Sequence, residues 1–211
     1  TTVDVLDDRS ARRILQSLQQ VYELYMRRGF QVVVCYLDPE FEPLKRITTE
    51  ISAVLNTTGA KEHVPEVERQ IRVIKERVRA VRSTLPYNII PKIMVGMMVW
   101  YVVSWLNNFP PKGSVSTTAS PRMIVTGTKL HIDRHCHIPF GAYTQIHKEN
   151  QPTNNMHPRT IGAIALGPTG NIQGSVYFLS LHTGELITRR SFTELPATVE
   201  VIVRIDELGK L

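Results

Sequence analysis

Two acidic residues and a row of basic residues in this 211-residue chain have the types and spacing that phosphate chemistry needs. Asp38 directly follows the apolar run Phe30–Leu37, and Glu68 lies near the start of a predicted helix over residues 65–85. Carboxylates that converge at strand ends bind Mg²⁺ or Mn²⁺, because these cations prefer oxygen ligands. Each acid also has a structural interpretation, Asp38 as a turn residue and Glu68 as an acid favoured at a helix N-terminus.

The predicted helix carries two stripes. Its apolar residues recur at steps of three and four, which predicts a stripe that faces a core. A second stripe begins at Glu68 and continues with cations at the same steps. We interpret this basic stripe as a phosphate-binding surface, and the alternative is a solvated face laced with ion pairs. The apolar residues are Val67, Ile71, Ile74, Val78, Val81 and Leu85, and the cations are Arg72, Lys75, Arg79 and Arg82, with Arg69 beside them.

The composition, net charge and cysteine count limit the class of protein to which the chain can belong. A hydrophobic content of 42% predicts a globular chain with room for one medium domain and one small domain. The net charge of +6 favours a polyanionic partner, although ribosomal and membrane-surface proteins share this sign. Only two cysteines occur, Cys35 and Cys136, so we expect a reducing intracellular setting without a disulfide framework. Neither cysteine has the context of a nucleophile.

The chain begins with TTVDVL, without an initiator Met or a signal segment, and we expect it to be cut from a longer protein. Its longest apolar run, Ile93–Leu106, is shorter than the roughly 20 residues that span a bilayer. We therefore predict a buried helix over Ile89–Asn107, with its aromatic and Met side chains in a core, and no membrane partner. A membrane span is the less favoured interpretation.

The first half of the chain predicts an α/β layer structure. Alternation predicts a strand over Thr1–Leu6, and capping residues predict a helix over Ala11–Arg28. The run Phe30–Leu37 is apolar on both faces, which is typical of a central strand covered on each side. A short second strand is predicted over Ile51–Leu55.

A stretch rich in Pro, Gly, Ser and Thr divides the chain. We predict a first domain over residues 1–109, a linker over 110–121 and a second domain over 122–211. Short alternating segments in the second domain predict a small β-barrel or sandwich. They are FGAYTQIH, TIGAIALG, GSVYFLSL and ELITRRSF.

The residues around both acids resemble the Asp-Asp-Glu integrase core of retroelements, which has the ribonuclease H-like fold, and the copia-type retrotransposon integrases in particular. In that family an apolar strand ends in the second catalytic Asp, and an acid-Phe pair follows; this chain has VVVCYL, Asp38, Glu40 and Phe41. The third catalytic acid opens a Val-x-Glu-Arg helix rich in Arg, which resembles the sequence around Glu68. The resemblance implies that Asp38 and Glu68 are catalytic and hold Mg²⁺ or Mn²⁺.

The second half resembles the same family, so that the resemblance covers nearly the whole chain. The segment after the integrase core is similar to SPRMIVTGTKL in this chain. The small β module of the family is similar to FGAYTQIH together with HPRTIGAIALGPTGNIQGSVYFLSLHTGELITRRSF. The implied architecture is a partial ribonuclease H-like core that lacks its first strands, followed by a small β-barrel module.

The chain also departs from the family pattern. The family's Asp-Asn-Gly-Gly turn is reduced to Asp38-Pro39, and KEHVPEVER replaces its Gln-Asn-Gly approach to the third acid. The two acids are 30 residues apart, which is shorter than usual in the family. The first catalytic Asp is expected upstream of residue 1, because the structural reading of Asp4 is favoured and Asp7 and Asp8 are better explained as helix-start residues.

The resemblance implies that the complete protein trims the 3′ ends of an element and joins them to target DNA. Basic side chains would contact DNA phosphates: Arg69, Arg72, Lys75, Arg79 and Arg82. Arg189 and Arg190 either extend this surface or form a solvated strand face. We expect a homo-oligomer on paired DNA ends, made in the cytoplasm as part of a polyprotein and acting in the nucleus. The alternatives are an inactive or domesticated integrase-derived nucleic-acid-binding module, and an α/β scaffold whose basic helix is only a surface.

A cluster of His131, His135, Cys136 and His137 invites a zinc interpretation. The spacing provides no paired-Cys knuckle and no second half-site. We therefore predict a loop with solvent-exposed histidines.

Overall fold

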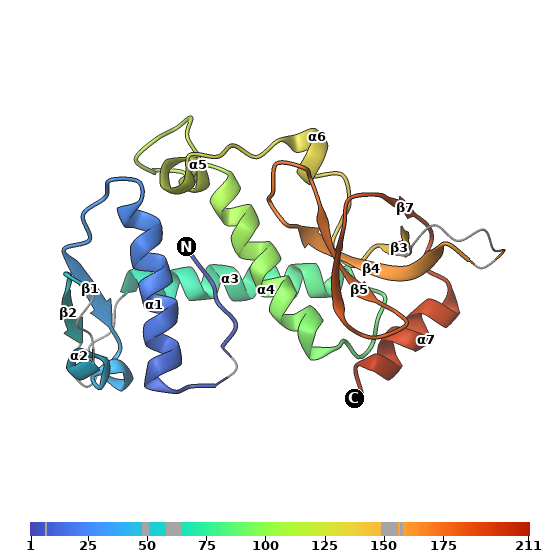
Figure 1. Ribbon diagram of the computed structural model, residues 1–211, viewed down its shortest axis with the longest axis horizontal. Helices are drawn as coiled ribbons and strands as arrows, with labels where there is room; N and C mark the ends of the chain where they lie inside the picture. Colours follow the sequence, from blue (N-terminus) through green and yellow to red (C-terminus); the bar gives the residue numbers. More distant parts are fainter. Residues whose placement is uncertain (7, 48–50, 58–64, 149–155, 157) are drawn as a thin grey trace. The chain divides into compact units, whose positions relative to one another are not determined.

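The computed structural model describes residues 1–6, 8–47, 51–57, 65–148, 156 and 158–211, which form two compact units (Figure 1). Unit 1 comprises Thr1–Lys75 and Trp105–Lys129, and unit 2 comprises Glu76–Ser104 and Leu130–Leu211. The units interleave along the chain, which passes from one to the other after Lys75, after Ser104 and after Lys129. The division predicted in chain order, at residues 1–109, 110–121 and 122–211, stays a prediction.

Helix α1 of unit 1, Ala11–Met26, confirms the predicted first helix. The hydroxyl of Ser10 caps it by accepting the backbone N–H of Arg13 at 3.3 Å. The Asp8 carboxylate in turn accepts the N–H of Ser10 at 2.7 Å, and hydrogen bonding from Ser10 lowers the pKa of Asp8. The prediction that Asp8 is a helix-start residue is confirmed, and Asp7 lies outside the described residues.

Strands β1, Val34–Leu37, and β2, Val54–Thr57, form a parallel pair in unit 1. The prediction of a central strand covered on both sides is wrong, because within the described residues β1 pairs only with β2. Side chains on β1 alternate between half-buried and exposed, and Tyr36 is 64% exposed. The apolar run therefore forms a strand whose side chains are partly exposed. Whether a strand is buried depends on the other segments that pack on it, and the strand's own sequence does not determine these.

The prediction of a strand over Thr1–Leu6 is also wrong, because these residues form neither helix nor strand. A strand needs a neighbour to pair its backbone groups, and alternation alone does not provide one. Side chains hold this segment instead: Gln70 donates to the Thr1 hydroxyl at 3.1 Å, and Asn107 donates to the Thr1 carbonyl at 2.5 Å. Asp4 is exposed in this irregular segment.

Short helices complete unit 1. The 3₁₀ helix η1, Pro39–Phe41, and helix α2, Leu44–Ile47, follow β1, and Leu44 is fully buried. Residues 109–120 form no helix or strand before α5, Pro121–Thr126, whose N-cap hydroxyl on Ser120 accepts the N–H of Met123 at 3.2 Å.

Two long helices pass from one unit into the other in sequence: α3, Pro65–Ser83, and α4, Lys92–Asn108. Both confirm predicted helices. Met94 and Met98 of α4 are fully buried, as expected for a core helix. In the part of the chain that the structure describes, no helix is long and apolar enough to span a membrane.

Unit 2 is built on a five-stranded antiparallel sheet with the strand order β6-β5-β4-β3-β7 (Figure 1). The fourth predicted segment contributes two strands, and a C-terminal helix that the sequence analysis did not predict follows them. The strands are β3, Tyr143–His147; β4, Thr160–Pro168; β5, Val176–Ser180; β6, Leu186–Arg189; and β7, Phe192–Glu194. The helices are α6, Ile132–His135, and α7, Val199–Leu208.

The main core of unit 2 lies between the sheet and helices α4 and α7. Burial of apolar side chains in this core makes the largest favourable contribution to the stability of the unit. Tyr87, which lies between α3 and α4, adds a buried ring with its hydroxyl 2.8 Å from the carbonyl of Gly141. The buried side chains of this core include Met94, Met98, Ile164, Leu166, Leu179, Val201 and Ile205.

The sheet is strongly curled. Only Arg190 and Ser191 connect β6, at one edge, with β7, at the other. Phe178 of β5 meets Phe192 of β7 with ring centroids 5.4 Å apart, although β4 and β3 lie between these strands. Among the described residues no ladder joins β6 to β7, so the sheet is open, and the predicted small β-barrel or sandwich is not confirmed.

Candidate nucleic-acid interface

Asp38 and Glu68 occupy exposed positions in unit 1. Asp38 is the N-cap residue of η1 and directly follows β1, and Glu68 lies in the first turn of α3. Because β1 and β2 are parallel, their carboxyl ends lie at the same edge of the sheet, with Asp38 at the end of β1. The chain reaches Glu68 eleven residues after Thr57, the last residue of β2. The convergence of the two carboxylates stays a prediction.

A polar contact that the sequence analysis missed holds the segment after Asp38. Lys45 donates to the Thr57 hydroxyl at 2.7 Å and lies 3.0 Å from the Glu42 carboxylate, which also accepts from Thr57. The spacing of Glu42 and Lys45 is visible in the sequence, but their meeting with Thr57 depends on the parallel pairing of the strands. The contact fixes the chain that follows Asp38 to the carboxyl end of β2.

The cations of α3 divide into an exposed group and one engaged residue. Arg69, Arg72, Lys75 and Arg79 are exposed, and we call these four residues the α3 cation face. Arg82 is half-buried, and its guanidinium donates to the carbonyl of Asn88 at 2.8 Å. The Arg82 side chain therefore holds the turn that follows α3, and this hydrogen bond would compete with the predicted contact to phosphate.

The charge of α3 is strongly positive despite three acids. The helix Pro65–Ser83 contains six cationic side chains and three carboxylates. One of these acids, Glu76, was overlooked in the sequence analysis; it follows Arg72 by four residues and precedes Arg79 by three, so it lies among the cations. The α3 cation face nevertheless carries four positive charges on one side of a helix, which is the arrangement that attracts a polyanion.

The apolar stripe of α3 is only partly buried. Val78, Val81 and Leu85 pack against the main core of unit 2, as predicted. Val67 and Ile71, at the beginning of the helix, are exposed. The periodicity of the apolar residues therefore identified the side of α3 that contacts the core. How many turns of the helix the core covers depends on the tertiary structure.

The two predicted metal ligands fit the donor chemistry of Mg²⁺ and Mn²⁺. Both are carboxylates, whose oxygens these hard cations prefer, and both are open to solvent. Among the described residues no group of three or more His, Cys, Asp and Glu side chains forms a metal-binding cluster.

The histidines around α6 differ in environment. His131 and His137 are exposed, as predicted. The prediction is wrong for His135, which is only 3% exposed, and the predicted loop contains the short helix α6. One ring nitrogen of His135, Nε2, lies 2.7 Å from the carbonyl of Asn171, and Nδ1 lies 3.2 Å from the backbone nitrogen of His131. His135 is buried because α6 packs on the β4–β5 hairpin, a contact between distant segments.

Both cysteines are half-buried, and the pKa of each thiol is raised. Burial raises the pKa of the Cys35 thiol. Burial, together with the nearby Asp133 charge, raises the pKa of the Cys136 thiol. Because the thiolate is the reactive form, both changes oppose nucleophilic chemistry at neutral pH.

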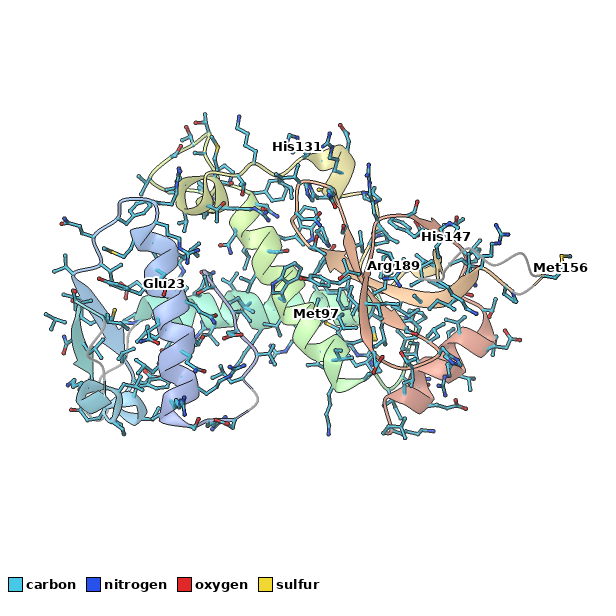
Figure 2. All side chains as sticks on the ribbon, in the orientation of Figure 1. Glu23, Met97, His131, His147, Met156 and Arg189 are labelled. Carbon is cyan, nitrogen blue, oxygen red and sulfur yellow. The ribbon has the colours of Figure 1, made fainter. Side chains whose placement is uncertain are left out.

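Arg189 links β6 to β3 in unit 2, and its part in a DNA surface stays a prediction. Its guanidinium donates to the carbonyl of His147 at 3.0 Å and to that of Thr188 at 2.7 Å (Figure 2). Arg190, the next residue, is exposed. Of the two arginines considered for a DNA surface, Arg190 is thus exposed and Arg189 is half-buried.

No protein-family model matches the chain, and no curated protein matches it either. The likeness to retroelement integrases therefore depends on the motifs around Asp38 and Glu68 and on those of the C-terminal half.

Proposed function

We propose that this chain is part of a copia-type retroelement integrase that binds DNA through the α3 cation face. The observation that carries the proposal is the exposure of Arg69, Arg72, Lys75 and Arg79 along the helix whose first turn bears Glu68. Exposed cations at helical spacing contact successive phosphates without reading bases, which suits an enzyme that inserts at many sites.

The architecture supports the proposal at a coarse level. We propose that the parallel pair β1–β2 with α1 and α3 corresponds to part of a ribonuclease H-like core, and that the curled sheet of unit 2 corresponds to the small β-barrel module of the family. The parallel pairing and the order strand, helix, strand in unit 1 agree with this assignment.

Asp38 and Glu68 would hold Mg²⁺ or Mn²⁺ in the complete protein. When bound, such a metal supplies Lewis-acid activation of the oxygens in phosphoryl transfer. The chain's own contribution is to present the two carboxylates: the Lys45 contact anchors the segment after Asp38, and α3 presents Glu68 in the same helix as the α3 cation face. Cations beside the site would neutralise DNA phosphates and orient the strand.

A second candidate is an inactive or domesticated integrase-derived module that binds nucleic acid without cleaving it. The 30-residue separation of Asp38 and Glu68 favours it, because the active family has a longer separation. Both candidates predict DNA binding, whereas an α/β scaffold with a merely solvated helix predicts none.

Salt-dependent binding to a DNA duplex tests the role of the α3 cation face. If its four cations each neutralise one phosphate, log K falls with log salt with a slope of about −3.6. Arg79→Gln should weaken binding and reduce this slope by about 0.9. Arg77→Gln is the matched control: Arg77 is exposed on the same helix but lies five residues after Arg72 and two before Arg79, which places it on the opposite side. Equal effects of the two substitutions would reject the assignment.

Titration with Mn²⁺ tests the metal site directly. The amide and carboxylate NMR signals of Asp38 and Glu68 should broaden together at low Mn²⁺ if both carboxylates hold one ion, and Asp38→Asn should reduce the broadening at Glu68. Independent responses would contradict a shared site. Metal-dependent nicking by a chain extended at its N-terminus with the family's first strands then distinguishes the enzyme from the inactive module.

Nuclear action, production as part of a polyprotein and assembly on paired DNA ends belong to the same proposal. They follow from the resemblance to retroelement integrases, and the net charge of +6 separately favours a polyanionic partner.

A further inference from the structure

A polar cavity in unit 2 lies apart from the residues that the proposed function uses. Its volume is about 410 Å³, and α6, the β4–β5 hairpin and the residue after β6 contribute to its wall. Cationic and hydrogen-bonding side chains converge on this space from segments that are far apart in the sequence. The lining residues include Asp133, Arg134, His137, Gln173, Gly174 and Arg190.

The wall of the cavity is held by contacts between α6 and the β4–β5 hairpin. The buried ring of His135 lies 2.7 Å from the carbonyl of Asn171, and Arg134 donates to the carbonyl of Ile172 at 3.1 Å. At Gly174 a Cβ atom would lie 2.8 Å from the carbonyl oxygen of Arg134, and φ is +74°. Only glycine allows this close approach of the two segments.

The hairpin is also fixed within itself. The Asn171 side chain accepts the backbone N–H of Ser175 at 2.9 Å and donates to the Ser175 hydroxyl at 3.0 Å. The Thr169 hydroxyl donates to the carbonyl of Ser175 at 3.1 Å. The cavity is therefore preformed, so that a ligand would not have to order its wall.

The charges around the cavity favour an anion. Arg134 and Arg190 bring two permanent positive charges, against the single carboxylate of Asp133. The imidazole of His137 stacks on Phe192 with ring centroids 5.2 Å apart and an interplanar angle of 9°, which fixes the ring in the wall. Guanidinium groups match the oxygens of a phosphate group, because two N–H donors can bind it at once.

We propose that this cavity binds the phosphate group of a ligand of about mononucleotide size, with Arg134 and Arg190 as its phosphate-binding residues. The volume exceeds that of a phosphate ion and lies in the range of roughly 300–1,000 Å³ that small-molecule sites occupy. The proposal does not depend on DNA binding by the α3 cation face, which uses other residues on another element.

Inorganic phosphate is the probe for the first experiment. In an amide NMR titration of the full chain at constant ionic strength, the signals of Gly174 and Arg190 should shift and saturate. Arg190→Gln should weaken phosphate binding about tenfold, the loss expected for one charge-assisted hydrogen-bonded contact. Arg190→Lys should lose less, because it keeps the charge but not the two-donor geometry.

Arg159→Gln is the matched control, since Arg159 is an exposed arginine of the same unit that does not line the cavity. It should leave the phosphate affinity unchanged. Shifts that do not saturate, or an equal loss in Arg159→Gln and Arg190→Gln, would overturn the proposal. The amide spectrum of each variant reports whether the fold is retained.

Competition distinguishes the two sources of the phosphate group. Displacement of phosphate by AMP, but not by a single-stranded oligonucleotide without terminal phosphates, would identify a free phosphorylated small molecule. Displacement by the oligonucleotide would identify a backbone phosphate of a nucleic acid, and both results support a phosphate site.

Discussion

At the residue scale, Tyr87 shows how a single polar atom is accommodated in the core of unit 2. Its ring is buried, and its hydroxyl donates to the carbonyl of Gly141 at 2.8 Å. Burial raises the pKa of Tyr87 to about 12, so the hydroxyl keeps its proton further into the alkaline range than an exposed tyrosine does. The folded pKa lies above the ordinary value of 10. The protonated hydroxyl of Tyr87 therefore contributes to the free energy of unfolding below pH 10, and this contribution is lost as the pH rises through about 12.

Tyr87→Phe should lower the free energy of unfolding by about 1 kcal/mol, because it removes the hydrogen bond and leaves the Gly141 carbonyl without this donor. Urea unfolding at pH 7 measures the change. Tyr36→Phe is the control, since it removes a hydroxyl from a ring that is 64% exposed and should have little effect. A similar loss in both variants would contradict the role assigned to the buried hydrogen bond.

At the scale of elements, Asp206 joins α7 to the segment that precedes α4. Its carboxylate accepts the backbone N–H groups of Asn88 and Ile89 at 3.0 and 3.1 Å and the side-chain amide of Asn88 at 3.1 Å. These hydrogen bonds, with that from Ile89 as the largest cause, lower the pKa of Asp206 below 3.8. A carboxylate on α7 thus pairs backbone donors on a segment more than a hundred residues away.

Stability should fall in acid because of Asp206. A depressed folded pKa gives a contribution that is present above the ordinary value of 3.8 and is lost as the pH falls through the lowered folded value. Asp206→Asn should destabilise the chain at pH 7 and reduce its acid sensitivity, measured as urea midpoints at pH 7 and pH 3. Asp4→Asn, at an exposed and irregular position, should keep the wild-type acid dependence; the assignment fails if Asp206→Asn keeps it too.

At the scale of the whole molecule, the exposed face of the β1–β2 sheet is relevant to assembly. Tyr36 and Val54 are both exposed, and a two-stranded sheet with exposed apolar side chains is a favourable surface for association. The proposed integrase function likewise implies a homo-oligomer on paired DNA ends. The homo-oligomer therefore stays a prediction, and the exposed face of β1 and β2 is the surface at which to test it.

Sedimentation velocity should show species heavier than the 24.0 kDa chain, with more of them when paired DNA ends are added. Tyr36→Lys should shift the distribution towards the monomer, because it places a charge on the exposed face of the sheet. Val115→Lys, at an exposed apolar residue outside the sheet, is the control and should change little. A single 24.0 kDa species under all conditions would contradict the expected oligomer.

The sequence by itself determined the local elements. Helices α1, α3 and α4 and the strands of unit 2 follow from periodicity and capping residues, which act within a few neighbouring residues. The alignment of the α3 cations on one side of the helix follows for the same reason, since residues three and four apart share a helix side in any context. Its DNA partner and the pairing of Asp38 with Glu68 remain predictions.

Only the tertiary structure decided which predicted surfaces are covered and which side chains are engaged. Tyr36 on β1 is exposed, and Arg82 is held by a carbonyl of the turn that follows its own helix. His135 is buried and Arg189 is held by the carbonyl of His147 because of contacts between segments far apart in the chain. The curl of the sheet, and with it the cavity beside Arg190, likewise depends on how distant strands pair. Such contacts depend on long-range packing, which local patterns of residues do not encode.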